Sequence, residues 1–343
     1  MKAVLLPGER EVRVVEREVP RPGPGEVLVR TRASAICRSD MSLYTGNPIV
    51  GGASAGRGLV VPGHEPAGDV VEIGPGATGL APGDRVTAYL AIGCMRCEYC
   101  RGGKLMLCPQ WKCLGFDVDG GDAEYFVVPA VNCLPLPDEL SYSAGALLTD
   151  MVGTQYATQK SIDVSGATTL AVFGMGPMGG AAVLVGKALG ATVLAVDLLD
   201  ERLALARELG ADAVVNSGSD DAAARLRELT CGQGPDAVVE CSGAPPAQNS
   251  ALDCVRKLGS VAFVGESRET TINPSDQLIR KLLRVTGGWY FPIGLFADLS
   301  RFAVRHELPI ERLVSHRYRL DDAAEAFRAF DRRLTDKAVF TWD

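Results

Sequence analysis

Two hydrophobic patterns divide the chain near Leu147. Up to about residue 148, short valine-rich apolar runs are separated by Pro-Gly pairs at positions 22–23, 75–76 and 82–83. Short runs bounded by such turn signals are typical of antiparallel strands. We therefore expect a β-rich first domain, with strands that include residues 26–30, 68–73 and 84–87.

Beyond Leu147, apolar strands alternate with amphipathic helices. Repeated strand–helix–strand units predict a parallel sheet with helices on both faces, and hence an α/β domain. The expected strands are 168–173, 192–197, 237–241 and 260–265, and the expected helices are 178–189, 200–209 and 246–257. The alternation ends near Gly287. After it we expect a helix at 321–330 and a final strand at 337–342.

A glycine-rich turn, Gly-Met-Gly-Pro-Met-Gly at 174–179, follows the expected strand 168–173 directly and opens the next helix. In a dinucleotide-binding turn, the first glycine permits the tight bend and the second lets the backbone approach a pyrophosphate. The third allows close packing of helix on strand, and the helix N-terminus offers free N–H groups to phosphate. The candidate cofactor-binding residues here are Gly174, Gly176, Pro177, Met178 and Gly179.

Asp197 ends the next expected strand, where a carboxylate can accept hydrogen bonds from the adenosine ribose and repel a 2′-phosphate. No arginine is adjacent to it, which favours NAD over NADP. The alternative is an ordinary glycine-rich turn with Asp197 as a surface carboxylate. Further candidate contacts of the cofactor are Arg202, Val264 and Gly288.

Four cysteines, Cys94, Cys97, Cys100 and Cys108, lie within fifteen residues. Four thiolates on a short loop can enclose Zn²⁺ tetrahedrally and leave no open position, which indicates a structural metal site. An iron–sulfur cluster is one alternative, because Pro109 follows the last cysteine, but the final gap is longer than in ferredoxin-type motifs. Four buried free thiols are another.

The composition narrows the classes of partner. The net charge of -7 and the pI of about 5.2 disfavour a nucleic-acid or anionic-membrane surface. The apolar run at the N-terminus stops at Pro7, too early for a secretory signal, and we find no apolar run long enough for a transmembrane helix. Clustered cysteines favour a metal site in a reducing compartment, so we expect a cytoplasmic protein.

Cys37, His64, Glu65 and Asp150 are scattered, and their spacing alone does not define a shared metal site. A solitary cysteine is usually a core residue, and Asp150 could simply cap a helix that begins at Met151.

The short motifs that contain these residues are more informative than their spacing. Cys-Arg-Ser-Asp at 37–40, Gly-His-Glu-Pro-Ala-Gly at 63–68, the four-cysteine loop, Gly-Ala-Leu-Leu-Thr-Asp at 145–150 and the glycine-rich turn occur in this order. This order resembles the medium-chain zinc-dependent alcohol dehydrogenase family over essentially the whole chain. The resemblance implies a GroES-like β domain at 1–148 and 290–343, with its four-cysteine zinc lobe at about 94–108. A Rossmann NAD-binding domain at 149–289 would be inserted between its two parts.

The resemblance also implies the roles of individual residues. Cys37, His64 and Asp150 would bind a catalytic zinc, and Glu65 would be a nearby carboxylate or a ligand that exchanges with water. The chain would thus hold two zinc ions, one catalytic and one structural. Ser39 would hydrogen-bond the substrate oxygen and start a proton relay, and Arg38 would contact the cofactor pyrophosphate.

One departure concerns that relay. Many family members carry histidine five residues after the first zinc ligand, where this chain has Ser42, so the relay would end differently. The implied substrate pocket contains Tyr44, Leu90, Trp111 and Trp289, although such aromatic residues are equally compatible with core packing.

We therefore expect an oxidoreductase that moves a hydride between a secondary alcohol, or its ketone, and NAD. Polyols and 3-hydroxy amino acids of the threonine type are alternative substrates. A non-catalytic NAD(H)-binding sensor on the same fold is the alternative of another class. The expected partner is a small-molecule alcohol or carbonyl compound, and the expected assembly is a homodimer or homotetramer.

Overall fold

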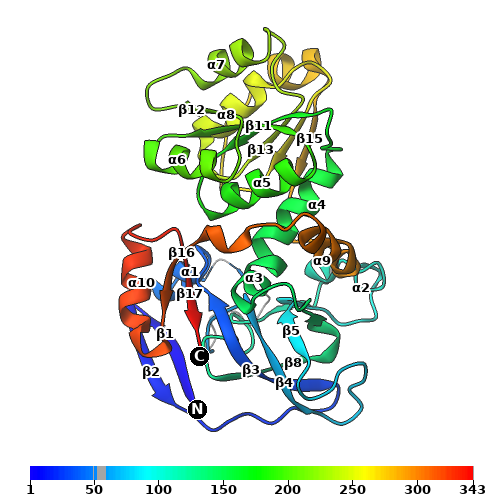
Figure 1. The fold of residues 1–343 in the computed structure, drawn as a ribbon, viewed down its shortest axis with the longest axis vertical. Helices are drawn as coiled ribbons and strands as arrows, with labels where there is room; N and C mark the ends of the chain where they lie inside the picture. Colours follow the sequence, from blue (N-terminus) through cyan, green and yellow to red (C-terminus); the bar gives the residue numbers. More distant parts are fainter. Residues whose placement is uncertain (49, 52–58, 343) are drawn as a thin grey trace. The chain divides into compact units, whose positions relative to one another are not determined.

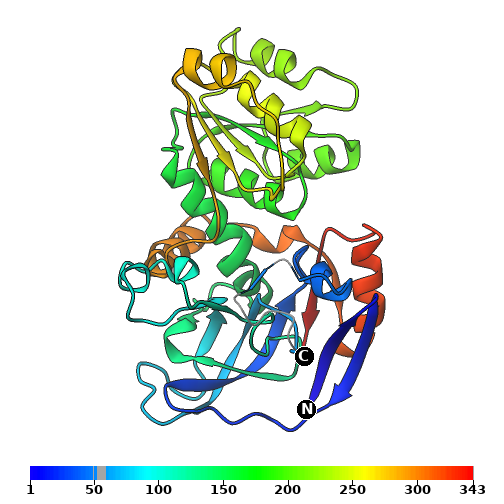
Figure 2. The same cartoon turned by 180° about the vertical axis from the view of Figure 1, so that it is seen from behind.

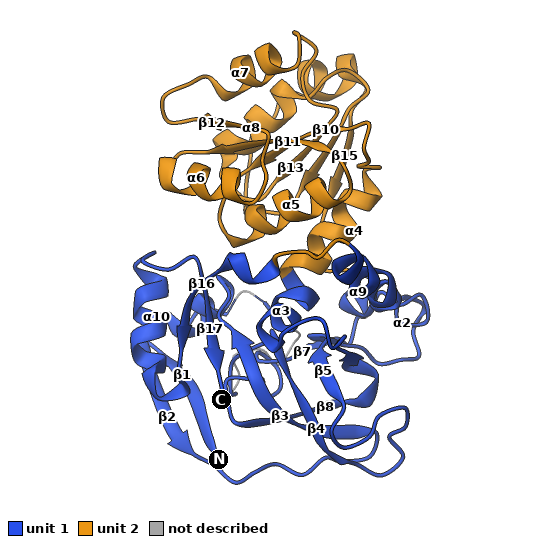
Figure 3. Cartoon of the chain, viewed as in Figure 1, with its two compact units in different colours: residues 1–150, 292–305, 310–343 blue, residues 151–291, 306–309 orange. Residues whose placement is uncertain are grey.

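The computed structural model describes residues 1–48, 50–51 and 59–342, and these form two compact units (Figure 3). Unit 1 comprises Met1–Asp150, Pro292–Arg305 and Ile310–Asp343, and unit 2 comprises Met151–Phe291 and His306–Pro309. Both chain ends lie in unit 1, at the blue and red ends of the ribbon in Figure 1. Each unit is built around a sheet of its own.

Unit 1 is mostly antiparallel β structure. The strands of its main sheet are β3 (Glu26–Ala35), β4 (Pro66–Ile73), β5 (Arg85–Ala88), β8 (Tyr125–Pro129), β9 (Cys133–Pro135), β16 (Val314–Tyr318) and β17 (Lys337–Thr341). Their order is β16-β17-β3-β4-β5-β9, with β8 pairing β3 outside this path. Two small antiparallel pairs add β1 (Lys2–Gly8) with β2 (Glu11–Glu16), and β6 (Ala91–Ile92) with β7 (Lys112–Cys113).

Strand β3 is the centre of unit 1, because it pairs antiparallel with β4, β8 and β17. Residues alternate between the two faces of a strand, and Val27 and Val29 lie on one face of β3 with no exposed surface. Phe126 of β8 and Val339 of β17 extend this core. The pairing of β17 with β3 joins the last segment of the chain to the first.

Short helices complete unit 1. They are α1 (Asp40–Tyr44), α2 (Glu98–Arg101), α3 (Tyr142–Leu147), α9 (Phe296–Arg305) and α10 (Ala323–Asp331). Ser141 caps α3, since its side chain accepts a hydrogen bond from Ala144 N. A π-helical turn, η3 (Leu148–Val152), follows α3 and contains Asp150.

Unit 2 contains a six-stranded parallel sheet, which confirms the α/β prediction. Its strands are β10 (Thr169–Phe173), β11 (Thr192–Asp197), β12 (Ala213–Asn216), β13 (Ala237–Glu240), β14 (Ser260–Phe263) and β15 (Arg284–Gly287). The order is β12-β11-β10-β13-β14-β15. The direction of the strand order reverses at β10, and the carboxyl ends of such strands are where doubly wound sheets bind ligands.

Helices lie on both faces of this sheet, as Figure 2 shows from behind. They are α4 (Gly153–Ser161), α5 (Pro177–Ala188), α6 (Asp200–Glu208), α7 (Ala222–Leu229) and α8 (Pro245–Cys254). On one side of the sheet, the core is formed by residues of the strands and of helices α7 and α8. Its members include Phe173, Leu194, Val238, Leu226 and Leu252, all at most 4% exposed. Because both faces are covered, an inner strand such as β10 is almost continuously apolar, whereas the edge strand β15 is not.

Three short strands and helix α9 are among the elements that the sequence analysis did not name. β12, β15 and β16 are strands of four or five residues with partly exposed positions, so their patterns are weak. Helix α9 carried a usable signal, because Phe296, Leu299 and Ala303 are spaced for one helical face and are all buried. Within the residues described, no helix is long and apolar enough to cross a membrane.

Candidate active site

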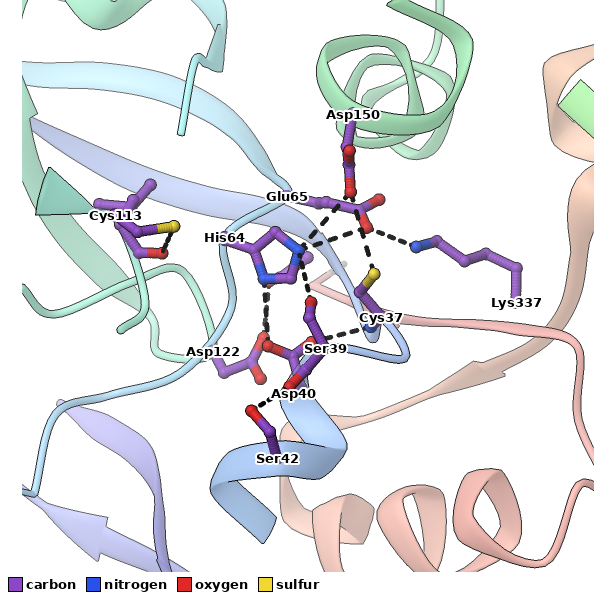
Figure 4. A network of polar contacts seen from close by, with 12 residues as sticks. Cys37, Ser39, Asp40, Ser42, His64, Glu65, Cys113, Asp122, Asp150 and Lys337 are labelled. Carbon is purple, nitrogen blue, oxygen red and sulfur yellow. Dashed lines mark hydrogen bonds and ion pairs between the residues drawn. The ribbon is translucent and has the colours of Figure 1, made fainter. Parts of the chain in front are cut away.

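Four side chains from three distant segments converge in unit 1 (Figure 4). Cys37 follows β3, His64 and Glu65 precede β4, and Asp150 lies in η3. One potential ligand atom from each lies within 4.8 Å of the others. Asp150 Oδ2 is 3.6 Å from His64 Nε2 and 3.9 Å from Cys37 Sγ.

The local backbone explains two of these positions. Gly63 has a φ of +93°, and a β-carbon there would lie 2.4 Å from Asp122 Oδ1, so only glycine fits before His64. Asp150 sits in a π-helical turn, a feature often found at functional sites because it redirects a side chain out of the regular helix.

Asp40 positions two of the four residues. Its Oδ1 lies 3.0 Å from Nδ1 of His64, and its Oδ2 accepts a hydrogen bond of 2.8 Å from the backbone N–H of Cys37. His64 and Asp40 are 1% and 0% exposed. A carboxylate on Nδ1 leaves Nε2 as the nitrogen that faces Cys37 and Asp150.

Glu65 is paired with a buried lysine of the last strand. Lys337 Nζ donates to Glu65 Oε1 at 2.5 Å, and the side chains are 1% and 0% exposed. Glu65 Oε2 is buried with no hydrogen-bond partner among the described residues. Burial raises the pKa of Glu65 to about 7, although Lys337 opposes that shift.

The cluster has the donors and spacing of a metal site. A tetrahedral zinc bound at about 2.0–2.3 Å separates its ligand atoms by roughly 3.3–3.8 Å, close to the two separations at Asp150 Oδ2. A thiolate, an imidazole and a carboxylate are all zinc ligands. The residues therefore fit a bound zinc.

Ser39 lies next to this cluster, and its Oγ is 3.5 Å from His64 Nε2. The Ser42 hydroxyl, at the position where the family resemblance implied a histidine, donates to the Ser39 carbonyl oxygen at 2.6 Å and so braces the start of α1. Arg38 is exposed.

The four-cysteine lobe forms the second cluster, and its four sulfurs also lie within 4.8 Å of one another. Backbone N–H groups point at them: Cys94 N and Gln110 N lie 3.4 and 3.3 Å from Cys108 Sγ. Backbone hydrogen bonds lower the pKa of Cys94 to about 6, whereas burial raises that of Cys100 to about 12. A central cation would reconcile the two by stabilising both thiolates.

In unit 2, the glycine-rich turn has the geometry expected of it. Gly174 has a φ of +83°, and a β-carbon on Gly179 would lie 1.9 Å from the Gly174 carbonyl oxygen. Gly176, by contrast, has an ordinary φ of −69° and open space where its β-carbon would be. Pro177 opens α5, whose first N–H groups receive no side-chain cap. Two glycines are thus needed for packing and one leaves room for a ligand.

Asp197 supports this turn. Its Oδ2 accepts from Met175 N at 2.6 Å, and its Oδ1 accepts from Leu198 N and Leu199 N at 2.7 and 3.0 Å. Arg202 approaches Asp197 Oδ2 to 4.0 Å. The carboxylate that was expected to contact a ribose therefore also braces the phosphate turn, a role that the sequence alone did not reveal.

The remaining expected residues fall in two places. Val264, Gly288 and Trp289 line one pocket of about 440 Å³ in unit 2. In unit 1, Tyr44 and Leu90 are buried, and the Tyr44 ring stacks on Phe327, so both serve the core. Trp111 is partly exposed beside the four-cysteine lobe, and Met178 is partly exposed in the first turn of α5.

Comparison with known proteins agrees with this architecture. Residues 23–138 match the alcohol dehydrogenase GroES-like domain, and residues 177–305 match the zinc-binding dehydrogenase family. L-threonine 3-dehydrogenase of Pyrococcus horikoshii is 35% identical over 338 residues, which cover 95% of this chain and 94% of the relative.

Solved structures agree as well. An alcohol dehydrogenase from Thermus sp. ATN1 superposes with a TM-score of 0.90 at 32% identity, covering 99% of both chains. The 2R,3R-butanediol dehydrogenase of Bacillus subtilis superposes with a TM-score of 0.89 at 30% identity, covering 100% of this chain and 99% of the other. The chain therefore belongs to the zinc-dependent alcohol dehydrogenase family, a class of medium-chain oxidoreductases, which confirms the family and the fold expected from its motifs.

Proposed function

We propose that this protein is a zinc-dependent dehydrogenase that transfers a hydride between a secondary alcohol, or its ketone, and NAD. One observation carries the proposal: a thiol, an imidazole and a carboxylate from three segments meet within 4.8 Å, beside the Ser39 hydroxyl. Three protein ligands with room for a fourth are what a catalytic zinc requires.

We assign Cys37, His64 and Asp150 as the ligands of this zinc, and the four cysteines at 94, 97, 100 and 108 as those of a structural zinc. When bound, the catalytic ion supplies a Lewis acid that favours the deprotonated alcohol. Ser39 Oγ would accept the hydroxyl proton of the substrate while it passes its own proton on to water, and Asp40 would keep Nδ1 of His64 protonated so that Nε2 can bind the ion.

Unit 2 holds the cofactor in this proposal. The uncapped N–H groups of α5 would hold the pyrophosphate beside the open space at Gly176, and Arg202 would add positive charge. The contact of Arg38 with the pyrophosphate, implied by the family resemblance, stays a prediction. The Asp197 carboxylate disfavours a 2′-phosphate, so we assign NAD as the cofactor. The pocket lined by Val264, Gly288 and Trp289 would receive the far end of the dinucleotide.

For the substrate, we propose apolar surroundings in unit 1, in which Trp111 is the partly exposed member of the expected set. Phe116, whose ring centre is 5.4 Å from that of His64, contributes to the same apolar surroundings. Such surroundings favour a carbinol that bears alkyl groups.

L-Threonine is the second candidate substrate, supported by the relative named L-threonine 3-dehydrogenase. The hydroxyl of threonine is on a secondary carbon, as are those of 2,3-butanediol. The metal site would therefore carry out the same reaction on each of these candidates. They differ in the charged or polar groups beside the carbinol.

The test is a screen of NAD⁺ reduction with simple secondary alcohols, 2,3-butanediol, polyols and L-threonine, repeated with NADP⁺. The proposal expects turnover of at least one secondary carbinol and a preference for NAD⁺. Binding of NADH without turnover of any member would instead favour the non-catalytic sensor.

We also propose a homo-oligomeric, cytoplasmic protein. Strand β15 is the edge of the unit 2 sheet, and the exposed apolar side chains of Val285 and Leu282, 39% and 71% exposed, lie on or beside it. An edge of this kind is a place where a second copy can add its own strand. Sedimentation analysis that found only monomers at micromolar concentration would remove the oligomer from the proposal.

A further inference from the structure

The buried lysine of the last strand has no part in the chemistry described above. Lys337 is 1% exposed, and its ammonium lies 2.5 Å from Glu65 Oε1. Figure 4 shows the side chain reaching from β17 toward the cluster of candidate ligands. Burying an ammonium group is costly unless it meets a specific need, so its position calls for an explanation.

The first part of the explanation is charge. Among the four candidate ligands, Cys37, Glu65 and Asp150 are anionic when they bind a metal, and His64 is neutral. Lys337 reduces their total of three negative charges to two, which a divalent cation neutralises. Loss of Lys337 would leave the loaded centre with a net charge of about −1, or about −2 when Asp40 behind the imidazole is counted.

The second part is competition for one atom. Glu65 Oε1, which accepts from Lys337, is also the oxygen that faces the site, 3.8 Å from His64 Nε2. An ammonium and a metal cation would both draw on this oxygen. While Lys337 holds it, Glu65 is a weaker fourth ligand, and the open position that catalysis needs is preserved.

We propose that Lys337 is a positioning residue of the metal centre, whose ammonium balances the ligand charge and keeps Glu65 from closing the fourth position on the zinc. This inference rests on the proposed metal site. It assigns Lys337 no contact with substrate or cofactor.

The direction in which the rate of zinc release changes distinguishes this role from simple packing. In Lys337→Met, the freed carboxylate would become a full fourth ligand, and the centre would gain negative charge. Zinc should then leave to a chromogenic chelator at least tenfold more slowly than from the native protein, while kcat falls at least tenfold. If Lys337 only packs β17, the same variant should lose zinc faster, because a damaged site holds its metal less well.

A second readout does not depend on activity. With Co²⁺ in the catalytic site, added azide should shift the visible absorption of the native protein, because a position is open to it. The Lys337→Met spectrum should be insensitive to azide. Lys337→Arg should restore azide sensitivity and bring zinc release to within threefold of native, since it keeps the positive charge.

If Lys337→Met alone does not fold, the double variant Glu65→Gln/Lys337→Met replaces it in the test. This variant removes the buried carboxylate and the buried ammonium together, so neither charge is left without its partner. The proposal expects zinc release from the double variant within threefold of native. Release at least tenfold faster than native would overturn it. Lys2→Met, which breaks the exposed Lys2–Asp321 pair of 2.7 Å in the same unit, is the matched control and should change neither readout.

Failure of this inference is distinguishable from failure of the proposed function. If Cys37, His64 and Asp150 do not bind zinc, the native protein should release only the ion of the four-cysteine lobe. Cys37→Ser would then leave the release curve unchanged. If the site does bind zinc and the release from Lys337→Met is as fast as native or faster, only the role of Lys337 is wrong.

Discussion

Asp40 and His64 form a buried pair in which Oδ1 of the carboxylate lies 3.0 Å from Nδ1 of the ring. The other oxygen of Asp40 accepts from the backbone N–H of Cys37 at 2.8 Å. One carboxylate thus orients two candidate ligands that lie 27 residues apart in the sequence. Neither contact could be read from the Cys-Arg-Ser-Asp motif without coordinates.

Asp40→Asn should damage the metal centre with little change in volume. A carboxylate accepts at both oxygens, whereas an amide offers one acceptor and turns a donor toward Cys37 N or His64 Nδ1. We expect a loss of about 10- to 100-fold in zinc affinity or kcat/KM, the usual cost of losing such a partner. Asp138→Asn, at a side chain 96% exposed, is the control. Native zinc affinity and activity in Asp40→Asn would contradict this reading.

Two substitutions should separate packing from binding in the glycine-rich turn. Gly176→Val places its side chain in open space with an allowed backbone, so it should weaken NAD binding at least tenfold and change stability by no more than about 1 kcal/mol. Gly179→Ala meets the Gly174 carbonyl oxygen at 1.9 Å, so it should also lower stability by roughly 1–3 kcal/mol. Calorimetric titration with NADH and thermal melts measure the two effects. Unchanged NADH affinity in Gly176→Val would show that the cofactor does not use this space.

Asp122 predicts a specific pH dependence of stability. Burial raises its pKa to about 7, with the Asp40 charge adding to the shift, and its Oδ2 has no hydrogen-bond partner among the described residues. An acid whose pKa is raised by folding stabilises the folded chain below its ordinary pKa, and this stability is lost as the pH rises toward 7. Asp122→Asn, which mimics the neutral acid, should remove that loss.

Relative to the native protein, Asp122→Asn should therefore gain stability by roughly 2–3 kcal/mol between pH 5 and pH 8. Melting temperatures of both proteins in matched zinc-containing buffers would show the difference widening with pH. A constant difference across that range would mean that Asp122 does not titrate there.

The four-cysteine lobe should lose its metal in Cys97→Ser. Zinc per chain should fall by one, and the lobe should become sensitive to proteases, because a short loop of this kind depends on its metal for order. The purified native protein should be colourless. A brown protein that contains iron would favour the iron–sulfur alternative instead.

Local patterns were sufficient for much of the fold. The strand expected at 192–197 has those same bounds in the structure, and the helix expected at 178–189 is α5, Pro177–Ala188. The spacing of the apolar residues and the turn residues that bound each element lie within a few positions of one another, so these elements can be predicted from the local sequence. The four-residue strand β12 was missed because so short and half-exposed a segment has no clear period.

The site depended on information that is not local. Cys37 and Asp150 are 113 residues apart, and only the order of motifs, through its resemblance to a family, suggested that they meet. Lys337 was visible only as a charged residue at the start of an apolar strand. Its approach to Glu65, 272 residues away in the chain, is a product of the pairing between β17 and β3.

The most direct test of the central claim is the zinc content of the native protein and of Cys37→Ser, measured by elemental analysis together with NAD⁺ reduction on the best alcohol of the screen. The account predicts about two zinc ions per chain in the native protein, one in the variant, and a loss of turnover of at least a hundredfold with the fold intact. A native protein with one zinc, or a Cys37→Ser variant that keeps both its second zinc and its turnover, would contradict it.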